Sequence, residues 1–330
     1  MLPNARFAWR PEDPRTGVEV TFDASASTDP DGSVTLFRWT FDEGPPVYAR
    51  GPLVFRTFRE AGLVHVELTV FDDLEEAGSS HANVTVREQL PQEDLLPYGG
   101  HWEDPDAFLI KNATQWAEVW NVVQGWRTSP PPRPEVNFTE ETVILAASGW
   151  RPSTGYGLWI YEVLFDGEGI EVYVNLTYPG CGFVGPMITH PVDVARIRGV
   201  WSDATFVFSH SLSCNGGSLA YGTDSPRYSP GNDVALSVKN ELNNRSLDFG
   251  PNHPLIVYRR VGEDWALIES RPSNEVNVTL RPGESFVWIW STGATANDTV
   301  LVGAGSFRLD LCVRPGHSWT FRLTTFFDLL

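Results

Sequence analysis

The sequence predicts an all-β protein with a single helix, from two features of composition and one of patterning. The thirteen Trp, nineteen Phe and nine Tyr residues favour strands over helices. The 29 Gly and 25 Pro are spread along the 330 residues, which suits many short strands joined by turns. Apolar and polar residues alternate in short runs, as they do in half-buried strands. We expect three domains, at residues 1–88, 103–212 and 230–330.

The first domain is predicted to be a β-sandwich. Turn signals such as Asp29-Pro-Asp-Gly32 separate its alternating runs. Evenly spaced short strands of this kind are typical of sandwiches. The runs are Val18–Phe22, Leu36–Phe41, Val64–Val70 and Ala82–Val86.

Several segments of this domain resemble PKD domains, which are Ig-like sandwiches. They are residues 20–33, 37–39, 57–62 and 66–73. The family usually has Trp-x-Phe-Gly-Asp-Gly, and this chain has Trp39-Thr-Phe-Asp-Glu-Gly44. The turn has therefore lost a glycine and kept its acidity.

The resemblance also implies a candidate calcium site, because some PKD domains bind calcium. Asp29, Asp31 and Asp72 stand at the positions that the family would use, and Asp73 is an equal candidate for the last. Ca²⁺ takes about six to eight oxygen ligands, several of them from carboxylates. The alternative is that Asp29 and Asp31 form Asx-type turns with their own backbone. Apart from this calcium, the sequence suggests no cofactor.

The one predicted helix spans residues 113–124, after a Pro-, Gly- and acid-rich segment at 88–102 that we expect to be a linker. Asn112 and Gln115 fit a capping box. An apolar face at i, i+3, i+4 and i+7 is expected to pack on the core; it consists of Trp116, Val119, Trp120 and Val123. Alternation predicts strands at 143–147, 158–163, 170–175 and around 192–197.

This block, residues 103–212, resembles the PrcB family, named for a polypeptide associated with a bacterial protease complex. The resemblance rests on residues 109–120, 136–145, the loop 149–156 and Pro179-Gly-Cys-Gly182. The family's loop usually contains Thr-Gly-Gly-Tyr, and here it is Ser153-Thr-Gly-Tyr-Gly157. The resemblance implies a β-rich domain with one helix and a surface protease as partner.

The third domain, residues 230–330, is predicted to be another Ig-like sandwich, after an expected linker at 213–229. It resembles the small Ig-like domains of bacterial proteinase inhibitors and surface proteins. A Pro282-Gly-Glu284 turn before the aromatic strand 286–290 is typical of that class.

Charge and sequons indicate where the protein acts. A net charge of −18 argues against nucleic acid as a partner, because phosphates need a basic surface. No apolar run is long enough to span a membrane, and residues 1–6 lack a signal-peptide pattern, so we expect any leader to precede this numbering. Seven N-x-S/T sequons, where roughly two are expected by chance, favour an extracellular or cell-surface glycoprotein. They are Asn83, Asn112, Asn137, Asn175, Asn244, Asn277 and Asn297.

The three cysteines allow one disulfide and one remaining thiol. Cys181 and Cys214 lie in Gly-rich segments and form the candidate pair. Cys312 lies in an apolar alternating run and is expected to be a buried free thiol.

No catalytic constellation is visible in the sequence, so we expect no enzyme. The seven His residues show neither HExxH nor another tight metal spacing, and we expect surface or half-buried structural roles for them. The sequence also contains no G-x-S-x-G elbow and no P-loop.

A loop at 151–157 is the candidate binding element. Gly155 and Gly157 allow sharp turns around Tyr156, which offers rigid contact area. The loop resembles the Pro-Thr-Thr-Gly-Tyr loop of chagasin-type inhibitors, which enters the clefts of cysteine proteases. The alternative is a plain hairpin whose tyrosine packs on its own sheet. The candidate residues are Arg151, Pro152, Ser153, Thr154, Gly155, Tyr156 and Gly157.

The expected function is therefore non-catalytic binding or scaffolding outside the cell. Its partner would be a protein, such as a surface protease, or a cell-surface glycan. The alternative function is protease inhibition through the 151–157 loop.

Overall fold

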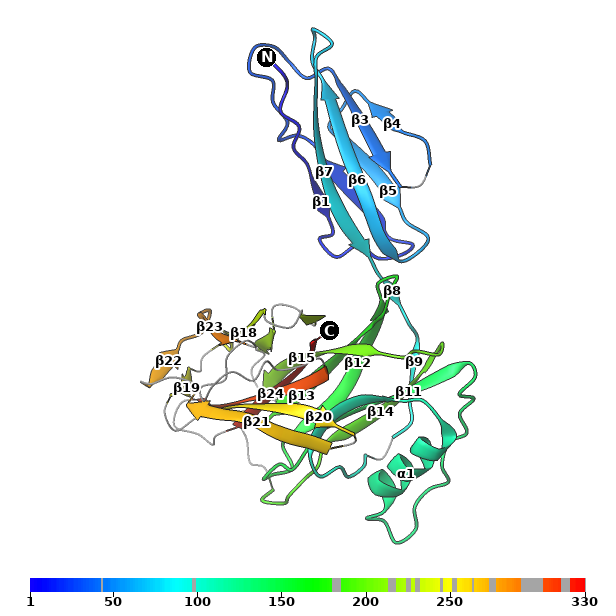
Figure 1. Ribbon diagram of the computed structural model, residues 1–330, viewed down its shortest axis with the longest axis vertical. Helices are drawn as coiled ribbons and strands as arrows, with labels where there is room; N and C mark the ends of the chain where they lie inside the picture. The colour runs from blue at the N-terminus through cyan, green and yellow to red at the C-terminus, as the bar shows by residue number, and fades with distance from the viewer. Residues whose placement is uncertain are drawn as a thin grey trace. The chain divides into compact units, whose positions relative to one another are not determined.

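The structure is a computed structural model that divides the chain into two compact units. The first comprises Met1–Leu90 and Leu164–Ile170, and the second comprises Pro91–Val163 and Glu171–Leu330 (Figure 1). The described residues are 1–42, 44–96, 99–179, 185–212, 218–223, 227–228, 232–243, 246–250, 254–262, 264–272, 277–291, 305–315 and 321–329.

Two antiparallel sheets build the first unit. One has the order β1-β2-β5 and the other β4-β3-β6-β7. The strands are β1 (Ala8–Arg10), β2 (Glu19–Asp23), β3 (Leu36–Phe41), β4 (Val47–Ala49), β5 (Leu53–Thr57), β6 (Gly62–Phe71) and β7 (Ala77–Val86).

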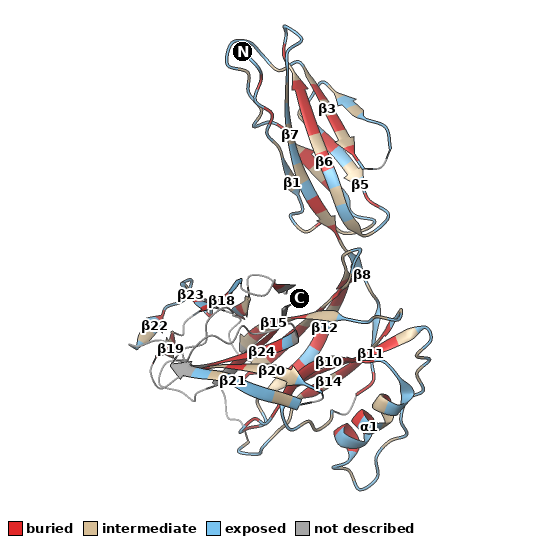
Figure 2. Cartoon of the chain, in the orientation of Figure 1, coloured by how far each residue is buried: buried red, intermediate tan, exposed pale blue. Residues whose placement is uncertain are grey.

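The core of this unit is aromatic and lies between the two sheets. Trp39 is fully buried, and its ring lies 5.8 Å from Phe22 and 5.2 Å from Phe7. Buried and less buried residues alternate along β3, as Figure 2 shows. Alternation of this kind sends every second side chain into the core of a sandwich. The predicted Ig-like β-sandwich is confirmed.

A four-stranded sheet in the second unit carries the helix. Its order is β10-β11-β14-β9. The helix α1 (Ala113–Gln124) begins at the predicted cap, where the Asn112 side chain accepts a hydrogen bond from Gln115 N. The helix buries the four residues predicted for its apolar face, in one cluster with Val143 and Leu145 of β11. The strands are β9 (Gln92–Asp94), β10 (Pro105–Ile110), β11 (Glu141–Ser148) and β14 (Val192–Arg198).

A second sheet runs through both of the domains predicted for residues 103–330. Its order is β23-β18-β16-β15-β13-β12-β8, in which β8 (Glu88–Gln89) pairs with Leu164 and Phe165. The remaining strands are β12 (Gly157–Phe165), β13 (Ile170–Tyr178), β15 (Ala204–Leu212), β16 (Ser218–Thr223), β18 (Asp233–Glu241) and β23 (Ser285–Ser291).

Strand β16 joins the two predicted domains because it pairs with β15 on one side and β18 on the other. It lies inside the expected linker 213–229, yet its Leu219 and Tyr221 are buried. The expected linker 88–102 likewise contains β9, which pairs with β14. Where we expected two domains, one continuous sheet therefore runs through the second unit, and only β8, Leu164, Phe165 and Ile170 of this sheet belong to the first unit.

The last sheet faces the C-terminal part of this one. It has the order β17-β25-β24-β19-β22, and β20 pairs with β21 and β24. Trp290 of β23 lies 5.9 Å from Phe307 and 5.8 Å from Phe327, so the two sheets share an aromatic core. The strands are β17 (Arg227–Tyr228), β19 (Leu247–Phe249), β20 (Pro254–Val261), β21 (Asp264–Pro272), β22 (Val278–Leu280), β24 (Gly305–Pro315) and β25 (Phe321–Leu329).

Candidate binding site

A cleft of about 310 Å³ opens in the second unit, beside β10, the start of β15 and the β20–β21 turn. A concave site with aromatic walls and a few polar groups is the common form of a small-ligand site. Six aromatic side chains line the cleft, four of them buried: Phe108, Phe206, Trp265, Phe307, Phe326 and Phe327. Polar side chains at the cleft include Lys111, Gln115, Asp203 and Arg260.

Trp265 is the aromatic side chain most firmly held in the cleft. Its Nε1 donates to Oδ1 of Asp106 at 3.1 Å, and its ring lies 5.5 Å from that of Phe326. The residue is half-buried, and the Arg260 and Arg308 guanidinium groups lie 5.5 and 5.4 Å from its ring centre. A flat surface fixed in this way loses little entropy when a ligand stacks on it.

Two arginines and a buried carboxylate support this tryptophan. Asp106 lies 3.5 Å from Nη1 of Arg260, and burial raises the pKa of Asp106 while Arg260 and the indole N–H lower it. The Arg260 guanidinium lies 4.9 Å from the Phe108 ring centre. Arg308 donates to the carbonyl of Pro105 at 2.5 Å. The hydrogen bond to Asp106, which Arg260 also approaches, therefore holds the edge of the Trp265 ring.

The predicted binding loop is held against its own sheet. Arg151 and Ser153 are buried, and the Tyr156 ring packs edge-on against buried Tyr178 at 5.6 Å. Thr154 N donates to Gly185 O at 3.2 Å. Tyr156, Gly155 and Gly157 are half-buried, while Pro152 and Thr154 are exposed. A role for this loop in binding stays a prediction.

The exposed apolar side chains in this region belong to residues next to the 151–157 loop, whereas Tyr156 of the loop is half-buried. Trp150 is 51% exposed, Met187 62% and Ile188 56%. Arg151 pairs with Thr189 in an antiparallel bridge, so the register brings Trp150 and Ile188 to either side of this pair. The surface that a protein partner would meet here is therefore Trp150, Met187 and Ile188.

The three carboxylates predicted for calcium lie near one another, since Asp31 and Asp72 both help to raise the pKa of Asp29, but two of them also have other partners. Asp31 Oδ2 lies 2.5 Å from the Met1 amino group, and Asp72 Oδ1 accepts from Leu74 N and Glu76 N, each at 2.8 Å.

Asp73 also lies close to Asp29, and its Oδ1 accepts a hydrogen bond from Ser33 N at 3.0 Å. Oδ2 of Asp29 and Oδ1 of Asp73 lie 2.6 and 2.3 Å from where a Cβ on Gly32 would stand. Oδ1 of Asp29 is buried without a hydrogen bond, and burial and the nearby carboxylates raise the pKa of Asp29. Calcium binding stays a prediction for Asp29, Asp31 and Asp72, with Asp73 as an equal candidate for the last.

The predicted modification sites differ in exposure. Asn83, Asn112, Asn137 and Asn277 are exposed. Asn175 is 8% exposed and donates to Ser211 Oγ at 2.9 Å, so a glycan on that nitrogen would have no space in the folded chain. Outside the described residues lie Asn244, Asn297, Cys181 and Cys214, and so does the side chain of Cys312.

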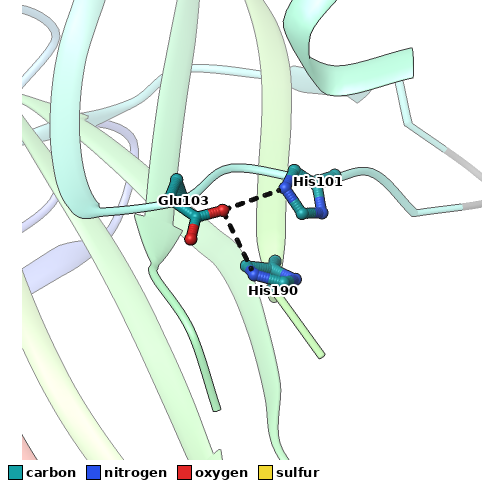
Figure 3. Close-up of side chains that lie close together, drawn as sticks. All are labelled: His101, Glu103 and His190. Carbon is teal, nitrogen blue, oxygen red and sulfur yellow. Dashed lines mark hydrogen bonds and ion pairs between the residues drawn. The ribbon is translucent and has the colours of Figure 1, made fainter. Parts of the chain in front are cut away.

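A cluster of His101, Glu103 and His190 was not anticipated from the sequence (Figure 3). Nε2 of His101 and Nε2 of His190 lie 3.2 and 3.5 Å from the same oxygen, Oε2 of Glu103. Burial and the neighbouring His101 lower the pKa of His190, while Glu103 raises it. The available signal was His101-Trp-Glu103, since alternate residues of an extended segment point to the same side. His190 is distant in the chain, and no spacing rule would have added it.

Two family models match parts of the chain: the PKD domain at residues 2–86 and the PrcB C-terminal domain at residues 142–198. The PKD and PrcB resemblances are therefore confirmed. The search of curated proteins found no match.

Solved structures similar to the chain include two PKD domains. The PKD1 domain of the Vibrio cholerae metalloprotease PrtV is 26% identical, with a TM-score of 0.23, covering 26% of this chain and 98% of that one. The PKD1 domain of Vibrio anguillarum Epp is 24% identical, with a TM-score of 0.23, covering 26% and 94%. A carbohydrate-binding module of the β-sandwich superfamily is 14% identical, with a TM-score of 0.28, covering 88% and 96%.

Proposed function

We propose that this protein is a non-catalytic binding protein of the cell surface or extracellular space, and that the cleft at Trp265 binds a carbohydrate. The match of residues 2–86 to PKD domains supports a place outside the cell. Within the part of the chain that the structure describes, no helix is long and apolar enough to cross a membrane. The observation that carries the proposal is the half-exposed, hydrogen-bonded Trp265 in an aromatic cleft.

The lining of the cleft suits a sugar ring for a chemical reason. The faces of a sugar ring carry C–H groups that pack on an indole, while its edges carry hydroxyls that need polar partners. Trp265 and Phe108, which are half-buried, supply the apolar surface, and Lys111, Asp203 and Arg260 supply donors and an acceptor. A cleft with both kinds of group is the arrangement that orients a polar ring and sets its specificity.

Titration with soluble polysaccharides and their oligosaccharides, followed by tryptophan fluorescence and calorimetry, tests the proposal. The probes are xylan, β-glucan and chitin oligosaccharides. Trp265→Ala should weaken binding at least about tenfold, as loss of a central aromatic residue does in other interfaces. Trp265→Phe should keep part of the affinity because it keeps a stacking ring.

Trp126→Ala is the matched control, because Trp126 is 57% exposed and does not line the cleft. It should bind like the parent chain. Equal affinity of the Trp265→Ala variant and the parent chain would contradict the proposal, and so would a complete lack of binding to every probe.

A second candidate function is binding of a protein, such as a surface protease, at Trp150, Met187 and Ile188. The match of residues 142–198 to the PrcB family and the exposure of these three side chains support it. Co-purification from the native envelope should recover a protease at stoichiometric amounts, and Ile188→Ser together with Trp150→Ala should abolish the recovery. Recovery unchanged by both substitutions would rule this surface out.

A further inference from the structure

Two segments far apart in the chain bring His101, Glu103 and His190 together in the second unit (Figure 3). His101 and Glu103 lie on the segment that leads into β10, and His190 lies just before β14. The His101 and His190 ring centres are 3.8 Å apart, with their planes inclined at 43°. Within the described ranges, only this group of three or more His, Cys, Asp and Glu side chains has ligand atoms that all lie within 4.8 Å of one another.

Backbone hydrogen bonds fix both segments against the end of β11. Glu103 O accepts from Trp150 N at 3.1 Å, and the adjacent Arg151 exchanges two hydrogen bonds with Thr189, at 2.8 and 2.9 Å. His101 N donates to Val123 O, at the end of α1, at 3.0 Å. The three side chains are therefore carried by backbone that is held in place independently of their mutual contacts.

Two of the three distances between the ligand atoms match a tetrahedral metal site, and the third is within 4.8 Å. Zn²⁺ lies about 2.0–2.2 Å from nitrogen and oxygen ligands, so ligand atoms around a tetrahedral ion are about 3.3 Å apart. The two nitrogens lie 3.2 and 3.5 Å from Oε2 of Glu103. Both values agree with this geometry.

We propose that His101, Glu103 and His190 bind a divalent transition-metal ion of the zinc type. Two imidazoles and one carboxylate suit zinc, whereas calcium prefers a complete set of oxygen ligands. The Glu103 side chain is 73% exposed, so solvent can reach the site and supply the fourth ligand.

A metal ion at this place would cross-link the segment of His101 and Glu103 to the segment of His190. Trp150 and Arg151 lie between them in the hydrogen-bond pattern. The ion would therefore also stabilise the backbone beside exposed Trp150 and Ile188. Because it binds the folded chain, it would raise the melting temperature, by an amount that grows with the logarithm of the ratio of free metal to Kd.

Calorimetric titration of the EDTA-treated full chain with ZnCl₂, at pH 7.5 in a non-chelating buffer, tests the proposal. We expect one tight site per chain. Glu103→Gln and His190→Ala should each weaken it by about tenfold or more, since even outer partners of metal ligands have effects of this size. Cobalt substituted for zinc should give the absorption bands of a tetrahedral site, and His190→Ala should remove them.

The double variant His65→Ala, His81→Ala is the matched control. These two rings lie 5.6 Å apart in the first unit and belong to no group of three ligands among the described residues. The control should bind zinc like the parent chain. Because Glu103 is highly exposed, Glu103→Gln should fold normally, which circular dichroism checks, even if His190→Ala does not. Unchanged zinc affinity in Glu103→Gln, or an equal loss in the control, would overturn the proposal.

Discussion

Acid should destabilise the second unit through a buried histidine, His210 of β15. Its side chain has 0% exposure and lies between the rings of Tyr178 and Tyr221, at centre distances of 5.6 and 5.9 Å. Burial, together with the charge of Arg151, lowers the pKa of His210 from 6.5 to about 3. The folded chain therefore keeps this ring neutral at pH values where the unfolded chain binds a proton.

The sign and size of the effect follow from this difference in pKa. Because the folded-state pKa lies below the unfolded value, the stability that His210 contributes is complete above pH 6.5 and is lost as the pH falls towards 3. Each pKa unit corresponds to about 1.36 kcal/mol. At pH 4.5, two units below the unfolded value, the free energy of unfolding should have dropped by about 2.7 kcal/mol.

Urea unfolding of the second unit at pH 7.0 and 4.5 measures this loss. His210→Phe fills a similar volume and cannot take up a proton. Between the two pH values, the free energy of unfolding of the variant should therefore fall by about 2.7 kcal/mol less than that of the parent chain. The carboxylates titrate in both proteins and cancel in the comparison. His65→Ala, at an exposed position, should behave like the parent chain. Identical pH dependence of the parent chain and His210→Phe would refute the reasoning.

Further predictions concern four other residues. Burial raises the pKa of Asp193 from 3.8 to about 6, so folding favours its protonated form, and the stability this gives is lost as the pH rises through 6. In urea titrations, the stability of Asp193→Asn relative to the parent chain should therefore be greater at pH 7 than at pH 4. Trp116→Ala, in the core under α1, should cost about 3–5 kcal/mol by the same assay. Calcium should raise the melting temperature of the parent chain and not of Asp29→Asn, and an equal rise in both would argue against that site. If the 151–157 loop inhibits a cysteine protease, Tyr156→Ala should abolish inhibition, whereas full inhibition by that variant would exclude the loop.

Features that depend on near neighbours in the chain could be predicted from the residues alone. The helix begins at Asn112 because the cap and its donor, Gln115, are three residues apart. Its buried face follows from the positions of Trp116, Val119 and their partners one turn later. Strand β3 has the predicted bounds, Leu36–Phe41, because alternation is a property of consecutive residues.

The way in which these elements combine depends on contacts between distant segments and became visible in the folded chain. Strand β16 joins the sheet by pairing with β15 and β18. The Gly- and Ser-rich composition of this segment does not predict a strand or its partners. Residues of β10, β15, β21 and β25 are among those that line the cleft at Trp265. Tyr156 packs on its own sheet because the buried ring of Tyr178 lies beside it. The cluster of His101, Glu103 and His190 likewise needs two segments held on the end of β11. Caps and alternation act over a few residues, whereas sheet order and sites depend on contacts between segments whose separation in the sequence carries no information about their distance in space.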